Sequence, residues 1–204
     1  MRKIGQTLAI FDLDGTITER DTMIEFYKFC FGKGYTYLYF FFIIPLIVLE
    51  RLKILDNQLL KEWTLSFFFW NKKETWIRQM GERFAQNKIE AMVRKEMQDR
   101  LDWHEKEGHE ILIITASCEL WLSAWIRDTS YSLISSKMAF KNGEFQGRLI
   151  GRNCHGKEKV IRLKETYDLK IFQKIYAYGD SSSDKYYMDL AHEQVNDFPP
   201  MKYL

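Results

Sequence analysis

Two aspartates with one residue between them are the first side chains in this sequence that could do chemistry. Asp12 and Asp14 flank Leu13, so on an extended strand their carboxylates share a face. Gly15 and Thr16 supply a turn whose backbone amides can approach an anion. One carboxylate could act as a nucleophile while the other exchanges a proton with a leaving group and then with water. The same residues also form ordinary acidic turns, so the pair alone does not decide the function.

Three further polar sites strengthen the chemical interpretation. The segment Gly-Asp-Ser-Ser-Ser-Asp at 179–184 contains Asp180 and Asp184, whose oxygens are the hard ligands that magnesium prefers beside a substrate phosphate. Thr115 offers a hydroxyl, and Lys159 offers an ammonium that could neutralise phosphate and carboxylate charge. Together with the aspartate pair, these residues predict phosphoryl transfer with Mg²⁺ as the cofactor.

Short apolar runs must position these residues. The runs cover 7–11, 111–114 and 175–178, and each ends directly before polar residues. Continuous apolar strands separated by helical segments are typical of a parallel sheet covered on both faces, which binds ligands at the carboxyl ends of its strands. We therefore predict an α/β fold with a Rossmann-like parallel-sheet core, in which the three polar ends converge.

The segment between the first two runs contains no convincing strand. Apolar residues recur with helical spacing in 59–69, 74–84 and 89–105. This spacing predicts an all-helical cap over 21–106, inserted after the first strand of a core that consists of 1–20 and 107–204. In that core, helices are expected at 119–126 and 156–167, and Asn-Gly at 142–143 indicates a hairpin or a short two-stranded flap.

The order of the polar residues resembles the haloacid dehalogenase superfamily of phosphatases, and the likeness covers almost the whole chain. The four motifs of that superfamily match Phe-Asp-Leu-Asp-Gly-Thr at 11–16, Thr115, Lys159 and the segment 179–184, in this order. Lys157 competes with Lys159 for the third motif. We prefer Lys159 because its spacing from a preceding glycine and a following leucine resembles phosphoserine-phosphatase-like members. The alternative keeps Lys157 as a surface charge or a substrate contact.

The resemblance implies a reaction in two steps. Asp12 attacks phosphorus to form an aspartyl phosphate, and Asp14 first protonates the leaving oxygen and then activates water. The Asp12 carboxylate, the Asp14 backbone carbonyl and Asp180 bind Mg²⁺, while Asp184 either reaches the ion or steadies Lys159. The site would act mainly by positioning and charge neutralisation.

A second set of residues is implied to hold the phosphate. Thr115, Lys159 and the backbone amides near Leu13 and Ala116 would receive its oxygens. Related dehalogenases, phosphonatases and membrane ion pumps lack an aspartate at the place of Asp14. The presence of Asp14 therefore favours hydrolysis of a phosphate ester over those reactions.

A helical cap directly after the first motif resembles the phosphoserine-phosphatase-like subfamily IB. In phosphoserine phosphatases an acidic residue early in the cap helps recognise the amino acid, and this sequence has Asp21 at the comparable position in place of the expected glutamate. Asp21 is therefore a candidate substrate-binding residue. It is equally a candidate N-cap of the helix that follows it.

The uncharged, aromatic-rich run at 35–49 is the second unusual feature of the cap. As a helix, about fifteen residues span roughly 22 Å, which is less than the roughly 30 Å hydrocarbon core of a bilayer. Pro45 would also kink such a helix, and cations and tyrosines lie within or beside the run. An anchor in the membrane interface is one interpretation, and a buried pair of cap helices is the other.

The whole pattern is similar to the subgroup that includes phosphatidylglycerophosphate phosphatase, which also has an apolar segment in the cap. This likeness implies a lipid phosphomonoester as the substrate and a membrane surface, met through 35–49, as a partner. Two alternatives stay open at this point. One is a soluble phosphatase for a small ester such as phosphoserine, and the other is a membrane-surface binding module without catalysis.

Composition excludes several other classes of protein. A formal net charge of +2 on 204 residues gives no electrostatic case for nucleic-acid binding. The three cysteines are widely spaced, which indicates neither a disulfide framework nor a zinc site. We therefore expect the chain in the cytoplasm, peripheral at the inner face of the cell membrane where the lipid interpretation applies. The sequence does not indicate an oligomeric state.

Overall fold

Five strands form one parallel sheet in the computed structural model, which describes residues 5–202 of the chain. The strands are β1 (Gln6–Phe11), β2 (Glu110–Cys118), β3 (Ser132–Ser136), β6 (Phe172–Tyr178) and β7 (Glu193–Val195). They lie in the order β3-β2-β1-β6-β7, and every neighbouring pair is parallel. The predicted α/β fold with a parallel-sheet core is confirmed.

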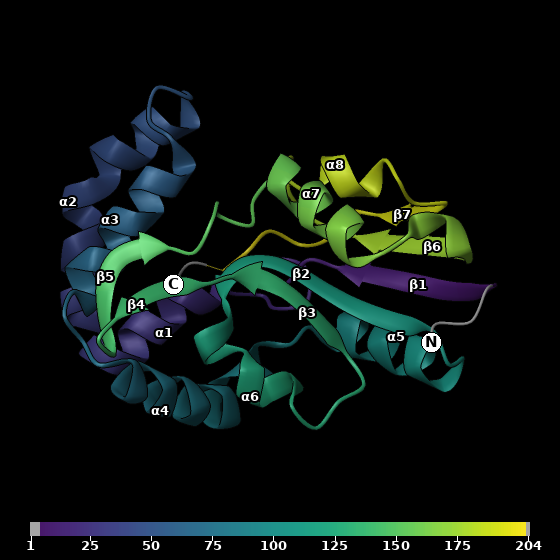
Figure 1. Cartoon of the computed structure of the whole chain (residues 1–204), viewed down its shortest axis with the longest axis horizontal. Coiled ribbons are helices and arrows are strands. Elements are labelled where there is room, and N and C mark those ends of the chain that lie inside the picture. Colours follow the sequence, from purple (N-terminus) through teal and green to yellow (C-terminus); the bar gives the residue numbers. More distant parts are fainter. Residues whose placement is uncertain (1–4, 203–204) are drawn as a thin grey trace.

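Burial on both faces explains why the central strands are continuously apolar. In β1, Ala9 and Phe11 pack into the hydrophobic core on one face, and Leu8 and Ile10 pack into a separate core on the other. Helix α5 (Lys95–Lys106) lies on one side of the sheet, while α7 (Lys157–Thr166) and α8 (Lys185–Met188) lie on the opposite side (Figure 1). No polar side chain could alternate along these strands without facing one of the two cores.

The strand order places the predicted polar segments at one edge of the sheet. The chain runs from β1 to β2 and β3 on one side and later to β6 and β7 on the other, so the direction of travel reverses between β1 and β6. Ligands bind in the crevice beyond the carboxyl ends of strands at such a reversal. The segments that follow β1 and β6 reach this crevice, as do Thr115 and Ser117 near the end of β2.

Helices fill the segment between β1 and β2. They are α1 (Thr22–Phe31), α2 (Lys33–Arg51), α3 (Asn57–Phe69), α4 (Glu74–Phe84), a π-helical turn (Ala85–Ile89), a 3₁₀ turn (Glu90–Met92) and α5. Helices α1 to α4 lie beyond the end of the sheet, whereas α5 returns beneath it and packs on β2 (Figure 1). The expected helix at 119–126 is shorter, with a 3₁₀ turn at Glu119–Trp121 followed by α6 (Ser123–Ile126).

The hairpin expected around Asn142-Gly143 consists of β4 (Met138–Lys141) and β5 (Glu144–Leu149). It lies beside α1 to α4 rather than beside the main sheet (Figure 1), and β5 packs on α3. The backbone amides of Asn71 and Phe145 complete this contact, because they donate to Phe145 O at 3.2 Å and Lys72 O at 3.0 Å, respectively. The division into 1–20 with 107–204 and 21–106 stays a prediction. The hairpin adds a β element to the helical layer.

Helix α2 is apolar on nearly all sides but is only partly covered. One side, with Tyr39 and Ile43, faces α3, and the outer side exposes Phe41 and Phe42 to 67% and 69%. The helix has 19 residues and runs through Pro45 without ending there. Its 19 residues span about 28 Å, which is longer than the roughly 22 Å expected for the run 35–49. Within residues 5–202 it is the one helix long and apolar enough, by length and composition, to cross a membrane.

Candidate active site

The end of β1 meets a buried lysine from α7. Lys159 Nζ donates to Asp12 Oδ1 at 2.5 Å and to Asp184 Oδ1 at 2.6 Å, and all three side chains are buried. Burial raises the pKa of Asp12 well above its ordinary value, and the Lys159 charge offsets part of that rise. Burial alone would lower the pKa of Lys159, but the two carboxylates raise it overall. The ammonium therefore stays charged and offsets part of the negative charge of the two carboxylates.

The structure places Lys159, and not Lys157, against the carboxylates. Lys157 is exposed on the first turn of α7, with its Nζ 5.9 Å from the centre of the Tyr186 ring. The two lysines are two residues apart on a helix, so their side chains point about 200° apart and only one can face the sheet. The preference for Lys159 agrees with this geometry.

Asp184 is held firmly in the loop after β6. The backbone amide of Ser181 donates to Asp184 Oδ2 at 3.1 Å, and the Ser181 hydroxyl donates to the same oxygen at 2.6 Å. Its other oxygen accepts the bond from Lys159. Because both oxygens are engaged, the orientation of this buried carboxylate is fixed by its own loop and by α7.

Three carboxylates form a cluster that could hold a metal ion. Oxygens of Asp12, Asp180 and Asp184 all lie within 4.8 Å of one another. Asp180 is exposed, and Thr16 donates from its hydroxyl to Asp180 Oδ1 at 3.3 Å. Partial desolvation of its carboxylate and the neighbouring Asp184 raise the pKa of Asp180. An all-oxygen carboxylate set fits a hard divalent cation such as Mg²⁺.

Gly15 gives this cluster the space it needs. Its φ of +92° lies in the left-handed region, and a Cβ added there would meet Asp180 Oδ2 at 2.3 Å. Any larger residue would push the Asp180 carboxylate away from the other two. The turn after β1 therefore requires glycine for both its backbone conformation and its side-chain space.

Asp14 points away from the carboxylate cluster, toward β2 and α1. Its Oδ2 accepts a bond from the Ser117 hydroxyl at 2.7 Å and lies 3.5 Å from the Thr115 hydroxyl. Its Oδ1 accepts a bond from the Thr22 backbone amide at 2.7 Å. The sequence analysis did not single out Ser117 or Thr22. Ser117 stands two residues after Thr115 and could have been found, because strand residues with that spacing share a face.

Asp21 caps α1, as the sequence allowed, and its role in substrate binding stays a prediction. Its carboxylate accepts from the Ile24 amide at 2.9 Å and so caps α1, and it also lines a cavity between the helices and the sheet. Burial and the charge of Asp14 raise the pKa of Asp21 to about 7. A ligand in the cavity would meet a carboxyl group that gains or loses its proton near neutral pH.

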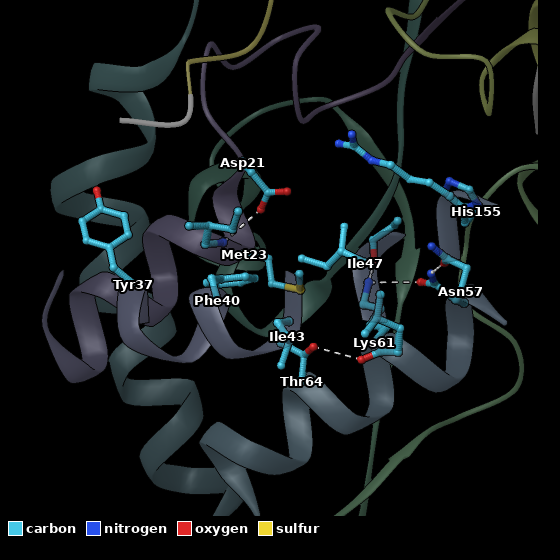
Figure 2. Close-up of a pocket in the computed structure, with 15 residues that line it drawn as sticks. Asp21, Met23, Tyr37, Phe40, Ile43, Ile47, Asn57, Lys61, Thr64 and His155 are labelled. Atoms are coloured by element: carbon cyan, nitrogen blue, oxygen red, sulfur yellow. Dashed lines mark hydrogen bonds between the residues drawn. The ribbon is translucent and has the colours of Figure 1, made fainter. Parts of the chain in front are cut away.

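The cavity has a volume of about 540 Å³ and begins beside the polar crevice. Ala116, which directly follows Thr115, lies at the crevice end, and helices α1, α2 and α3 form the other walls. The apolar lining residues are Met23, Ile24, Phe40, Ile43, Ile47 and Leu60. Figure 2 shows Asp21 on one side of this space and Lys61, Asn57 and His155 on the other. The cavity is thus apolar in its walls and polar at its ends.

Lys61, a residue of α3 that the sequence analysis did not single out, links the helices to the sheet. Its ammonium donates to the backbone carbonyl of Ala116 and, at 3.0 Å, to Asn153 Oδ1. Asn153 is itself held by the Ser136 hydroxyl at 2.8 Å. This contact ties α3 to the end of β2, directly after Thr115. A single lysine in an amphipathic helix carries no sequence signal for such a contact.

Comparisons with known proteins agree with this architecture. The family model described as haloacid dehalogenase-like hydrolase matches residues 9–189. The chain is 27% identical over 191 residues to the protein CicA of Caulobacter vibrioides, with 92% of this chain and 84% of CicA covered. The residues matched by the family model include Asp12, Asp14, Thr115, Lys159 and Asp184.

Solved structures share the fold at low sequence identity. A protein of unknown function from Bordetella pertussis Tohama I superposes with a TM-score of 0.80 at 19% identity and covers 94% of this chain and 90% of its own. A phosphoserine phosphatase, solved as a phospho-aspartyl intermediate analogue, superposes with a TM-score of 0.67 at 13% identity, with 95% and 87% covered. These likenesses extend over the helices as well as the sheet.

Proposed function

The chain belongs to the haloacid dehalogenase-like hydrolase family, and from this premise we propose that it is a Mg²⁺-dependent phosphomonoester hydrolase that works through an aspartyl phosphate on Asp12. We further propose that its substrate is a membrane phospholipid with a terminal phosphate, such as phosphatidylglycerophosphate. Membership of subfamily IB and the likeness to the phosphatidylglycerophosphate phosphatase subgroup stay predictions from the sequence.

The observation that carries the reaction is the Lys159 bridge. A nucleophilic carboxylate must approach a phosphate that is itself negatively charged, so a cation has to lie beside it. Lys159 contacts Asp12 Oδ1 directly, which leaves Asp12 Oδ2 as the oxygen for attack. Asp184 holds the same ammonium from the other side and so prevents it from turning away.

The proposed steps use two carboxylates with separate tasks. Asp12 attacks phosphorus, the bond from phosphorus to the ester oxygen breaks, and that oxygen takes a proton from Asp14. A water then attacks the aspartyl phosphate, gives its proton to Asp14, and releases inorganic phosphate and free Asp12. The Ser117 hydroxyl and the Thr22 amide hold the Asp14 carboxylate for both transfers.

Asp12, Asp180 and Asp184 are the side chains that would hold the metal. Bound Mg²⁺ would neutralise phosphate charge and fix the orientation of the phosphate relative to Asp12. The Thr16 hydroxyl and the space at Gly15 keep Asp180 turned toward the other two carboxylates.

The lipid part of the proposal is supported by the cavity and by the exposed side of α2. The cavity beside Ala116 has apolar walls, which suit an uncharged portion of a substrate rather than the polar body of phosphoserine. Phe41 and Phe42 are about two-thirds exposed on the opposite side of the same helix, where a lipid surface could cover them. One helix would then face the membrane and line the substrate cavity.

The proposed location follows from the same features. Helix α2 contacts both α1 and α3 and exposes its outer side, so we propose that the segment 35–49 lies in the membrane interface and does not cross the bilayer. Lys33 and Arg51 at its ends suit anionic head groups. We place the protein in the cytoplasm, peripheral at the inner face of the cell membrane.

Phosphate release in the presence of Mg²⁺ tests the reaction. The substrates are phosphatidylglycerophosphate in mixed micelles, phosphoserine and a set of soluble phosphomonoesters, each with Mg²⁺ and with excess EDTA. Asp12→Asn is the inactive variant, and Asp99→Asn, which changes an exposed aspartate of α5, is its matched control. Turnover that survives EDTA or Asp12→Asn would overturn the proposed mechanism.

The same substrates decide between the lipid and the soluble proposals. A strong preference for the lipid supports the membrane substrate. A preference for phosphoserine would return α2 to the interpretation of cap packing and leave the catalytic residues as proposed. Vesicle binding by a folded protein that hydrolyses none of the substrates would favour the non-catalytic binding module.

A further inference from the structure

Three lysines are buried among the residues that the structure describes, and one of them lacks a carboxylate partner. Lys28 pairs with Glu25 at 2.8 Å, and Lys159 pairs with Asp12 and Asp184. Lys61 is only 8% exposed, as Lys28 is, yet its two hydrogen-bond acceptors are the neutral oxygens of Ala116 and Asn153. A buried ammonium with no carboxylate at hydrogen-bond distance is costly, so its presence calls for a cause.

The position of Lys61 indicates what would supply the missing charge. It lines the apolar cavity at the point where the cavity meets the end of β2, one residue from Thr115. An ammonium has three N–H donors, and two of them are used by Ala116 and Asn153. The third donor remains for a molecule in the cavity.

Arg51, the last residue of α2, lines the same cavity and has no hydrogen-bonding or ion-pair partner within residues 5–202. The one carboxylate in the cavity lining is Asp21, which caps α1 and lies near enough for the Lys61 charge to lower its pKa. Two cations therefore face an apolar space that contains one carboxylate. The lining carries an excess of positive charge that the protein itself does not balance.

We propose that Lys61 and Arg51 form a second anion subsite, which binds a negatively charged group that joins the phosphorylated end of the substrate to its apolar portion. This subsite rests on the proposed function, because it assumes that the phosphomonoester lies at Asp12 while the rest of the molecule occupies the cavity. A phosphodiester has the required chemistry, since it carries one negative charge and connects a polar alcohol to an acylated glycerol. The subsite would make Lys61 a specificity-determining residue rather than a catalytic one.

Direct binding tests the subsite without turnover. The ligand is dihexanoyl phosphatidylglycerol, which has the phosphodiester and short acyl chains but no phosphomonoester, and dihexanoylglycerol is the uncharged comparison. Both are titrated into the full chain by calorimetry below their critical micelle concentrations. We expect the charged ligand to bind at least about tenfold more tightly than the uncharged one, as a buried charge pair should provide.

Matched variants assign the effect to Lys61. Lys61→Met should remove that difference, whereas Lys28→Met, which changes a cap lysine of equal exposure, should retain it. Lys61→Arg should restore much of it because the charge is kept, and Arg51→Gln should reduce it by a smaller factor since Arg51 is exposed. Equal binding of the two ligands, or equal losses in Lys61→Met and Lys28→Met, would overturn the subsite.

Hydrolysis provides an independent readout of the same inference. Dihexanoyl phosphatidylglycerophosphate and hexyl phosphate differ in the diester, and Lys61→Met should raise KM for the first at least about tenfold more than for the second. If both substrates are hydrolysed and Lys61→Met changes KM equally for the two, the subsite is rejected and the phosphatase proposal stays intact. Absence of hydrolysis with charge-selective binding would reject the phosphatase proposal and keep the subsite.

Discussion

The crevice at the end of β1 and the cavity beside it differ in the partners of their buried lysines. In the crevice, Lys159 donates to two carboxylates at 2.5 and 2.6 Å, so the buried cation lies directly against buried anions. In the cavity, Lys61 is almost as buried and meets only carbonyl oxygens. The crevice carboxylates thus have a cationic partner within the protein and leave room for a metal ion at Asp12, Asp180 and Asp184, whereas Lys61 has no carboxylate at hydrogen-bond distance.

Under the proposed function, this difference separates the part of the site that would perform the chemistry from the part that would select the substrate. A reaction centre gains from groups already held in place, because no reorganisation is then needed in the transition state. A pocket that selects a substrate gains from buried charges whose desolvation cost is offset only when the correct ligand binds. The two neighbouring regions therefore suit reaction and recognition, and the predictions below test that contrast.

The contrast is tested most strongly by removing each lysine in turn. Lys159→Met leaves Asp12 and Asp184 buried and facing each other, so we expect unfolding free energy to fall by about 3 kcal/mol and kcat to fall by about 10³ or more. Lys61→Met removes an unbalanced charge together with two hydrogen bonds, and we expect a change in unfolding free energy below about 1.5 kcal/mol. Urea denaturation and phosphate release measure both.

Lys157→Met is the control for this pair, because Lys157 lies on the same helix as Lys159 and is exposed. It should retain wild-type stability within about 0.5 kcal/mol. Equal stability losses in Lys159→Met and Lys61→Met would contradict the distinction between the two regions.

Gly15→Ala breaks the metal cluster without changing a charge. The new Cβ would meet Asp180 Oδ2 at 2.3 Å, so we expect activity to fall by about 10² and the Mg²⁺ concentration for half-maximal activity to rise. Gly5→Ala is a close control, because Gly5 has the same φ of +92° with no atom within 4 Å of the added Cβ. An unchanged Mg²⁺ dependence in Gly15→Ala would count against the carboxylate trio as the metal site.

Phe41→Ser and Phe42→Ser test the outer side of α2. Each phenyl ring would be buried in the membrane when the protein binds, and such burial is worth about 2 kcal/mol. Loss of one ring should therefore weaken binding to anionic phospholipid vesicles by about tenfold or more. Co-sedimentation measures the binding, and Ile161→Ser, at an exposed isoleucine of α7, is the control. Equal vesicle binding by all four proteins would remove α2 as the membrane surface. Hydrolysis of a soluble phosphomonoester should be little affected by any of the three changes.

The smallest expected effect concerns stability of the sheet region in acid. Burial and the neighbouring His109 lower the pKa of His104 to about 4, and His104 bonds to the Tyr178 hydroxyl at 2.9 Å. In the unfolded chain His104 takes up a proton near its ordinary pKa of about 6.5, before the folded protein does. The free energy of unfolding is therefore highest above pH 6.5 and declines as the pH falls toward 4. His104→Gln should reduce that decline by about 2 kcal/mol at most.

Thermal melts of wild type and His104→Gln at pH 7.5, 6 and 5 test this difference. The two melting temperatures should converge as the pH falls, because the penalty applies only to the wild-type protein. A gap that stays constant over this range would show that His104 does not titrate with folding.

Much of the crevice could be predicted because each residue stands beside a recognisable strand. The apolar runs before Asp12, Thr115 and Asp180 indicated strands, and parallel strands bring their carboxyl ends to one edge. The strands β3 and β7 were missed, since Ser-Leu-Ile-Ser-Ser and Glu-Gln-Val lack the length or apolar continuity of a buried strand. Such short edge strands are stabilised by the neighbour they pair with, which a local pattern does not show.

The sequence by itself determined the residue types of the reaction centre and the class of sheet that holds them. Motif order and strand pattern are visible along the sequence, so the aspartates, the threonine and the lysine could be predicted without a structure. Tertiary structure decided that Lys159 faces Asp12, that the hairpin β4–β5 joins the cap helices, and that Lys61 reaches Ala116 without a carboxylate partner. These contacts join segments far apart in the chain, and their energies depend on burial that exists only after the segments pack together.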